Sequence, residues 1–185
     1  MREVSVHTVI SAPREEVFDF VSDLAGRPAW TDHYMHDYRL ARINAVGEGA
    51  AARFRLRLPF GREYAELSVA EFDRPRRIVE QLAVGRRGRN RSVAVFDFTR
   101  EASAVTRVEL TTYAEPATFV DRIKEFGAAS YMRRQTRKQL DRLRMIFEEP
   151  PKEPLRRASV AGYEAAKAPR FGVAAGTDPA RPARH

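Results

Sequence analysis

Residues 105–113, VTRVELTTY, alternate apolar and polar side chains, whereas residues 119–149, FVDRIKEFGAASYMRRQTRKQLDRLRMIFEE, repeat large apolar side chains every three or four positions. The first pattern is typical of a strand with one buried face, and the second of a helix with one apolar side. Two prolines follow at positions 150 and 151. The stretch predicts a strand and then a helix over residues 117–149, roughly 45 Å long at 1.5 Å per residue. A helix of that length can lie across a whole sheet.

Five further strand-like runs precede this last strand, and short turn signals separate them. Closely spaced runs of this kind are typical of an antiparallel meander. The six predicted strands cover residues 38–46, 51–59, 62–72, 77–84, 91–99 and 105–113.

Two hairpins of this meander can be tested by pairing their side chains. With a turn at residues 60–61 and a loop at residues 101–103, apolar side chains meet on one face and opposite charges meet on the other. Arg53, Arg55 and Arg57 should then face water. The predicted apolar pairs are Phe54 with Leu67 in the first hairpin and Phe96 with Val108 in the second.

The N-terminal part predicts one strand and two short helical segments. Residues 2–10 alternate as a strand. Pro13 then begins a short amphipathic helix, with Glu15 and Glu16 in its first turn where acidic groups complement the helix dipole. Gly26 and Pro28 interrupt it, and residues 30–37 form an irregular or briefly helical segment before the next strand.

The composition fits one domain with a genuine core. The chain has 185 residues, 43% of them apolar, and no cysteine, so thiolate nucleophiles, zinc fingers and iron–sulfur clusters are excluded. No segment approaches the roughly 18 apolar residues of a membrane span, and the start lacks a signal-like pattern. We therefore expect a cytoplasmic protein, and its oligomeric state stays open.

Half of the net charge of +8 lies in the last 36 residues. This segment, 150–185, is rich in Pro, Ala and Arg and has few large apolar side chains, so we predict a mostly disordered tail after a folded domain at 1–149. Only four of the 33 basic residues are lysines, a bias that the base composition of the coding DNA can produce without function.

Several motifs resemble the SRPBCC superfamily, which joins START-like lipid-transfer domains with polyketide cyclases and dehydratases. They are ISAPREEVFDFVSDL (10–24), PAW (28–30), VGEGAAARF (46–54), EFDRPRRI (71–78) and TRVEL (106–110). The resemblance covers residues 3 to about 148. It implies an α+β helix-grip fold, in which a seven-stranded antiparallel sheet wraps around the long C-terminal helix, with two short helices after the first strand.

The same resemblance implies an apolar cavity between the sheet and the last helix. The small residues 127–129, Gly-Ala-Ala, fit either such a space or close packing of the helix on the sheet. We expect the ligand to be a small hydrophobic or amphipathic molecule, with no cofactor and no metal. The expected ligand-binding residues are Trp30, His33, Tyr34, Phe54, Glu80, Arg87, Phe96, Phe119, Ile123 and Phe126.

Glu80 is the most informative of these residues. Pairing it with Val69 across the turn at residues 73–76 directs its carboxylate to the apolar face, where it needs a partner or a raised pKa. It could act as a general acid or base. A buried hydrogen bond, or a bulge that returns it to solvent, is the favoured interpretation.

Two polar segments lie at the end of the meander where a cavity would open. The loop at 85–91 carries four arginines, among them Arg87, which suit a carboxylate or phosphate but also fit a solvated turn. His33 and His36, three residues apart, could ligate a metal or exchange protons. Because nothing else in the sequence completes such a site, we favour a surface or rim position.

Three functions remain open on the sequence. The first is a non-catalytic carrier of a lipid or polyketide-like molecule. The second is a polyketide cyclase- or dehydratase-like enzyme with the same pocket, in which Glu80, His33 and Tyr34 orient the substrate and move protons. The third is a module that binds RNA or a protein through the basic helix and the tail, although that helix alternates its charges with a core stripe. We expect no specific nucleic acid partner.

Overall fold

A computed structural model of the chain describes residues 2–59, 61–85, 88, 90–115, 119–149, 151 and 153–160, with the side chains of residues 2 and 115–129 excepted. The elements are β1 (Arg2–Ile10), α1 (Arg14–Ser22), α2 (Pro28–Thr31), β2 (Met35–Leu40), β3 (Ala51–Leu58), β4 (Gly61–Asp73), β5 (Arg77–Val84), β6 (Asn90–Ala102), β7 (Val105–Glu115) and α3 (Phe119–Glu148).

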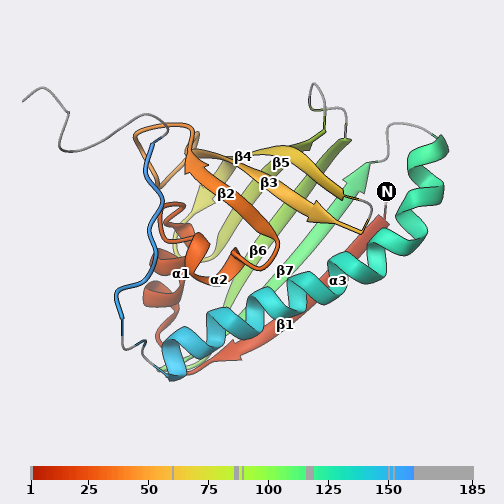
Figure 1. The fold of residues 1–185 in the computed structure, drawn as a ribbon. Coiled ribbons are helices and arrows are strands. Elements are labelled where there is room, and N and C mark those ends of the chain that lie inside the picture. Colours follow the sequence, from red (N-terminus) through yellow and green to blue (C-terminus); the bar gives the residue numbers. More distant parts are fainter. Residues whose placement is uncertain are drawn as a thin grey trace, which may run out of the picture.

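The seven strands form one antiparallel sheet in the order β1-β7-β6-β5-β4-β3-β2. Figure 1 shows α3 running alongside β1 and beneath the sheet, with α1 and α2 at the end where α3 finishes. This is the helix-grip arrangement expected from the sequence. The meander, the two short helices and the long last helix are all confirmed.

The two predicted hairpin registers are wrong by two residues. Phe54 pairs with Ala65, and Phe96 pairs with Leu110. In the second hairpin β6 continues to Ala102, into the predicted loop, with a bulge between Arg100 and Ala102. A shift of two residues leaves every side chain on its own face, so the apolar pattern does not distinguish the two registers.

The strand predicted at 38–46 begins and ends earlier, at Met35–Leu40. The residues after it form a loop that contains Gly47 and Gly49 with φ of +92° and +75°. These left-handed conformations are accessible to glycine and interrupt a strand, which explains why the run ends before them. The loop also contacts the turn that follows α1, where the Leu24 amide donates to the Ala45 carbonyl at 3.0 Å.

The core is densest where α1 covers the sheet. Val17, Phe18 and Val21 of this helix are fully buried. The Phe18 ring meets the rings of Phe72 and Phe98 edge to face at 5.2 and 5.1 Å. Each aromatic pair of this type contributes roughly 0.5–1.5 kcal/mol of stability beyond the burial of the rings. These contacts stabilise the packing of α1 on the sheet.

The chain folds back on itself after α3. The Ala158 amide donates to the Ala25 carbonyl at 2.7 Å, and the Leu40 amide donates to the Ser159 carbonyl at 3.0 Å. Arg157 forms an ion pair with Asp23 at 2.7 Å. The first part of the segment predicted as a tail therefore lies against β2 and the turn between α1 and α2. Residues 161–185 lie outside the described part.

Candidate functional site

The inner face of the sheet, which is turned toward the three helices, changes character along its strands. Near α1 one row of paired positions carries large side chains that are almost completely buried. These residues are Val6, Ile78, Phe96 and Leu110.

Further along β6 and β7, toward the loop between β5 and β6, the inner side chains become small. Ala94 pairs with Thr112, and Ser92 pairs with Ala114. All four are partly exposed, and so is Leu82 beside them. Since protein interiors are packed as densely as organic crystals, partial exposure on the inner face means that the described side chains leave this part of the sheet incompletely covered. It offers apolar surface to another molecule.

A buried ion pair lies at the boundary between the two parts. Glu80, on β5 between Val69 and Ala94, is 2% exposed, and Arg27 is 1% exposed. Arg27 Nη2 donates to Glu80 Oε1 and also to the Val21 carbonyl at 3.1 Å, while Nη1 donates to Glu80 Oε2 at 3.3 Å. Both carboxylate oxygens are therefore engaged, and the predicted direction of Glu80 and its buried hydrogen bond are confirmed.

The turn between α1 and α2 places Arg27 at this position. Arg27 immediately precedes α2, and its carbonyl accepts a hydrogen bond from Thr31 Oγ1 at 2.9 Å. Its guanidinium carbon lies 4.7 Å from the centre of the Trp30 ring and 5.4 Å from that of Phe96. A cation at such distances is attracted to the face of an aromatic ring, so two rings and one carboxylate hold the guanidinium.

The electrostatics of the pair favour its charged form. Burial alone lowers the pKa of Arg27, but the Glu80 carboxylate and its hydrogen bonds, together with Tyr38 and Tyr34, more than offset burial, and the pKa is raised. Arg27 thus remains a cation inside the protein. The pair as a whole carries no net charge.

Three buried polar atoms around Arg27 have no hydrogen-bond partner among the described residues. They are Arg27 Nε, Trp30 Nε1 and the Tyr38 hydroxyl. The first two can only donate, and the third can donate or accept. Buried donors normally have acceptors, because leaving one unsatisfied costs about 1–3 kcal/mol. Each of these atoms could be satisfied by an oxygen atom of water or of a ligand.

Tyr34 and His33 connect this cluster to α3. The Tyr34 hydroxyl, fully shielded from solvent, donates to Gln139 Oε1 at 2.5 Å, and His33 Nε2 donates to the Gln135 carbonyl at 3.3 Å. Burial raises the pKa of the Tyr34 phenol and of the Tyr38 phenol. Burial lowers the pKa of His33, and the nearby cations Arg142 and Lys138 act in the same direction. The hydrogen bond to the Gln135 carbonyl opposes this shift.

The structure brings five of the expected ligand-binding residues together on or beside the inner face, namely Trp30, Tyr34, Phe54, Glu80 and Phe96. His33 is half-buried and contacts α3, and its position at a cavity rim stays a prediction. Arg87 and the side chains of Phe119, Ile123 and Phe126 lie outside the described residues.

Sequence reasoning missed Arg27, Tyr38 and Gln139. Arg27 lies in the interruption between Gly26 and Pro28, where a solvated charge is the default. The available signal was the inward carboxylate of Glu80, which requires a buried cation somewhere in the chain.

Neither a metal site nor a membrane span is found in the described part of the chain. No group of three or more His, Asp or Glu side chains there could hold an ion, and Asp32 is bound by Arg142 at 2.8 Å. No helix there is long and apolar enough to cross a bilayer.

Comparison with known proteins places this geometry in a family. Residues 1–148 match the family described as polyketide cyclase / dehydrase and lipid transport. The chain belongs to this family. Its description joins an enzymatic activity with a transport activity. No similar sequence was found among curated proteins.

Solved structures support the fold of this family member. The KanY protein is 20% identical, with a TM-score of 0.65 over 80% of this chain and 99% of the other. A protein from Nitrosospira multiformis is 17% identical (TM-score 0.60, coverage 79% and 96%). One from Thermus thermophilus is 18% identical (TM-score 0.59, coverage 77% and 94%). At these identities the likeness concerns the fold alone.

Proposed function

We propose that this protein binds and carries a small hydrophobic or amphipathic molecule between the inner face of the sheet and α3. The family includes lipid transport, which supports a carrier. The observation that carries the proposal is the change from large to small inner side chains beside a buried ion pair with unsatisfied donors.

The buried end of the ligand carries a neutral oxygen acceptor, such as a ketone, ester or amide carbonyl. Arg27 and Glu80 already neutralise each other, so a carboxylate would bring an unbalanced third charge into the interior. A carbonyl oxygen instead accepts hydrogen bonds from the free donors Arg27 Nε and Trp30 Nε1 without adding charge. The apolar remainder of the ligand lies on Ala94 and its small neighbours.

Carriage is favoured over cyclase chemistry by the state of Glu80. A general acid or base must reach the substrate with an available oxygen or proton. Both carboxylate oxygens of Glu80 accept hydrogen bonds from Arg27, and the side chain is shielded from solvent. Glu80, the residue that the enzymatic hypothesis needs most, is therefore held in the ion pair with Arg27.

The first test is native mass spectrometry of the purified full-length chain, followed by denaturing extraction of any bound molecule. A second test compares a long-chain methyl ketone with the alkane of equal length as competitors of 1-anilinonaphthalene-8-sulfonate. We expect the ketone to bind more tightly, by about 2- to 10-fold for each of the two hydrogen bonds. Trp30→Phe should reduce this preference, because it removes one of the two donors and leaves Arg27 Nε.

Ala94→Phe, matched by Val93→Phe on the outer face of the same strand, locates the site. Ala94→Phe fills the space above the small side chains and should weaken binding at least about tenfold, whereas Val93→Phe should not. If neither competitor binds, and the purified chain carries no molecule, the carrier proposal is wrong. Equal binding of ketone and alkane would reject only the acceptor chemistry.

A further inference from the structure

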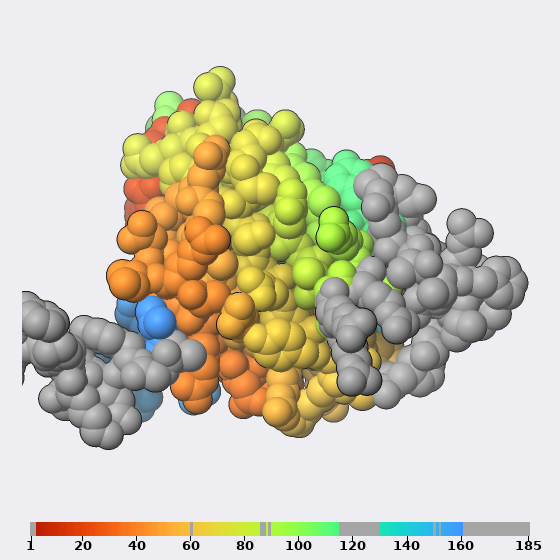
Figure 2. Space-filling model, turned by 90° about the horizontal axis from the view of Figure 1, so that it is seen from above, coloured from red at the N-terminus to blue at the C-terminus, as the bar shows by residue number. Residues whose placement is uncertain are grey.

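The outer face of the sheet, turned away from the helices, carries a cluster of exposed arginines over three neighbouring strands. Figure 2 shows this side of the molecule, where β2, β3 and β4 lie next to one another. Two carboxylates accompany them, Glu66 beside Arg53 and Asp37 beside Arg55. We call these arginines the basic face, and its members are Arg39, Arg53, Arg55, Arg57 and Arg62.

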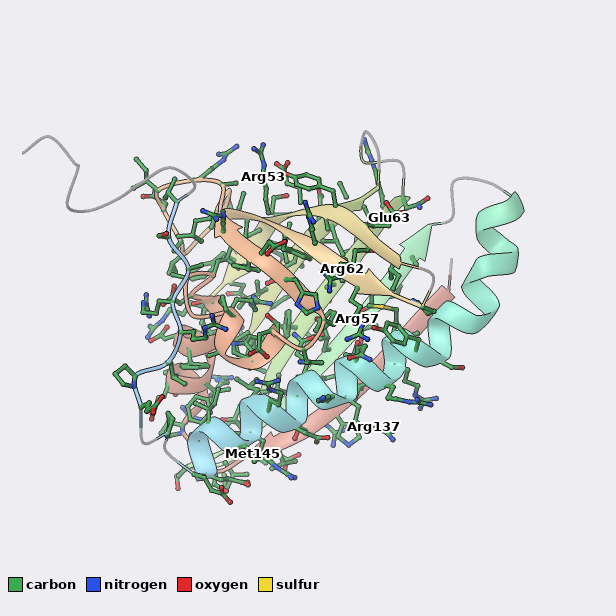
Figure 3. The ribbon with its side chains drawn as sticks, viewed as in Figure 1. Arg53, Arg57, Arg62, Glu63, Arg137 and Met145 are labelled. Atoms are coloured by element: carbon green, nitrogen blue, oxygen red, sulfur yellow. The ribbon has the colours of Figure 1, made fainter. Side chains whose placement is uncertain are left out.

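The register sets like charges directly against each other on this face. Arg57 lies opposite Arg62 across β3 and β4, and Arg39 lies opposite Arg53 across β2 and β3. Figure 3 shows Arg53 and Arg57 on β3 and Arg62 on β4. Like charges directly opposite on one face destabilise an antiparallel pair. Opposite charges at these positions would stabilise the sheet more. The like charges leave positive potential on this face, which a bound anion would neutralise.

Tyr64 is an exposed aromatic ring in the middle of the basic face. It is 54% exposed, and it lies directly opposite Arg55 on β3. Its diagonal neighbours across the strands are Arg53 and Arg57, and Arg62 is two residues away on its own strand. A large, half-exposed ring with four arginines at neighbouring register positions offers a stacking surface beside positive charge.

The spacing along β3 suits a regular anionic backbone. Arg53, Arg55 and Arg57 alternate with buried side chains, so successive guanidinium groups leave the strand roughly 6.8 Å apart. Proteins bind single-stranded nucleic acids with cationic side chains that follow the phosphates and aromatic rings on which bases stack. Both elements are present here on one face of the sheet.

We propose that the basic face binds single-stranded nucleic acid, with its arginines on successive phosphates and a base stacked on Tyr64. An anionic bilayer is the less suitable partner of the strands, because their described outer positions hold no Leu, Phe or Trp side chain that could insert into lipid. The large exposed apolar side chains Ile43 and Val46 lie in the loop between β2 and β3. The site is separate from the proposed carrier site, which occupies the opposite face of the sheet.

The binding test uses the full-length chain and a fluorescein-labelled oligouridylate of about 12 nucleotides, followed by fluorescence anisotropy at several salt concentrations. An oligothymidylate of equal length distinguishes RNA from DNA, and both outcomes agree with the proposal. Arg57→Gln and Arg62→Gln should each weaken binding and lower the slope of log affinity against log salt by about 0.7. Tyr64→Ala should weaken binding about fivefold or more, and Tyr64→Phe should restore it.

Arg137→Gln on α3 is the matched control. Arg137 is an exposed arginine on another element, so its replacement changes the net charge by the same amount. We expect the control to bind the oligouridylate like the unmodified chain. Equal losses in Arg57→Gln and Arg137→Gln would indicate unspecific attraction to a basic protein and would overturn the proposal. Binding of the chain to vesicles of phosphatidylglycerol and phosphatidylcholine, without binding to either oligonucleotide, would also overturn the proposal.

Discussion

Two pairs of arginine and glutamate in this molecule have the same chemistry and opposite surroundings. In the pair of Arg27 and Glu80 the side chains are 1% and 3% exposed, whereas in the pair of Arg53 and Glu66 they are 55% and 45% exposed. The buried pair is shielded from water, so each of its charges is stabilised by the other. The second keeps its water, so its attraction is screened and worth at most about 1 kcal/mol.

The difference shows how one sheet serves two purposes. On the inner face a charge is tolerated only with a partner, and the leftover donors around Arg27 define what else can bind there. On the outer face charges are individually inexpensive, so arginines can accumulate in positions such as Arg57 and Arg62 that oppose one another. Four experiments test this contrast between buried and exposed groups.

The largest effect is expected for breaking the buried pair. Arg27→Met leaves the Glu80 carboxylate without its cation and should lower the free energy of unfolding by about 3–5 kcal/mol. Arg53→Met, the matched change in the exposed pair, should alter it by less than about 1 kcal/mol. Thermal and urea unfolding followed by circular dichroism measure both values.

The double variant Arg27→Met with Glu80→Leu sharpens the result. Replacing both partners by apolar side chains removes the unpaired charge, so most of the lost stability should return. If the double variant is as unstable as Arg27→Met alone, the packing of the guanidinium against Trp30 and Phe96 matters more than its charge, and the contrast between the two pairs fails.

The buried pair also shows what sequence reasoning could achieve. The alternation on β5, paired with Val69 on β4, directed Glu80 inward, and the structure confirms that register residue by residue. Alternation identifies a face but not a partner, because the cation comes from a turn 53 residues earlier. Nothing local in that turn distinguishes Arg27 from the other basic residues of an arginine-rich chain.

The fold was accessible for a different reason. A helix such as α3 and a meander repeat their pattern over many residues, so a single local error does not change the topology. Pairing partners such as Phe54 and Ala65 depend instead on the exact position of one turn, and a slip of two residues preserves every face. Sequence patterns therefore predicted which residues face inward better than which residues touch.

A smaller effect on stability is expected from replacing two tyrosines, one buried and one exposed, whose hydroxyl groups are uncharged. Tyr34→Phe leaves the buried Gln139 amide without its donor and should lower the free energy of unfolding by about 1–3 kcal/mol. Tyr64→Phe, at an exposed ring, should change it by less than about 0.5 kcal/mol. Equal effects in urea unfolding would show that the link between Tyr34 and α3 contributes nothing.

The smallest effect has the opposite sign. Arg62→Gln removes one of two like charges that face each other, so it should raise the free energy of unfolding, by about 0.2–1 kcal/mol. This corresponds to a melting temperature higher by a few degrees at most for a chain of this size. The gain should shrink in high salt, since the repulsion lies in solvent and is screened there. A variant that is more stable but binds an oligonucleotide less well would show that the basic face is maintained at the expense of stability, whereas lower stability would mean that Arg62 supports the fold and that its opposition to Arg57 is harmless.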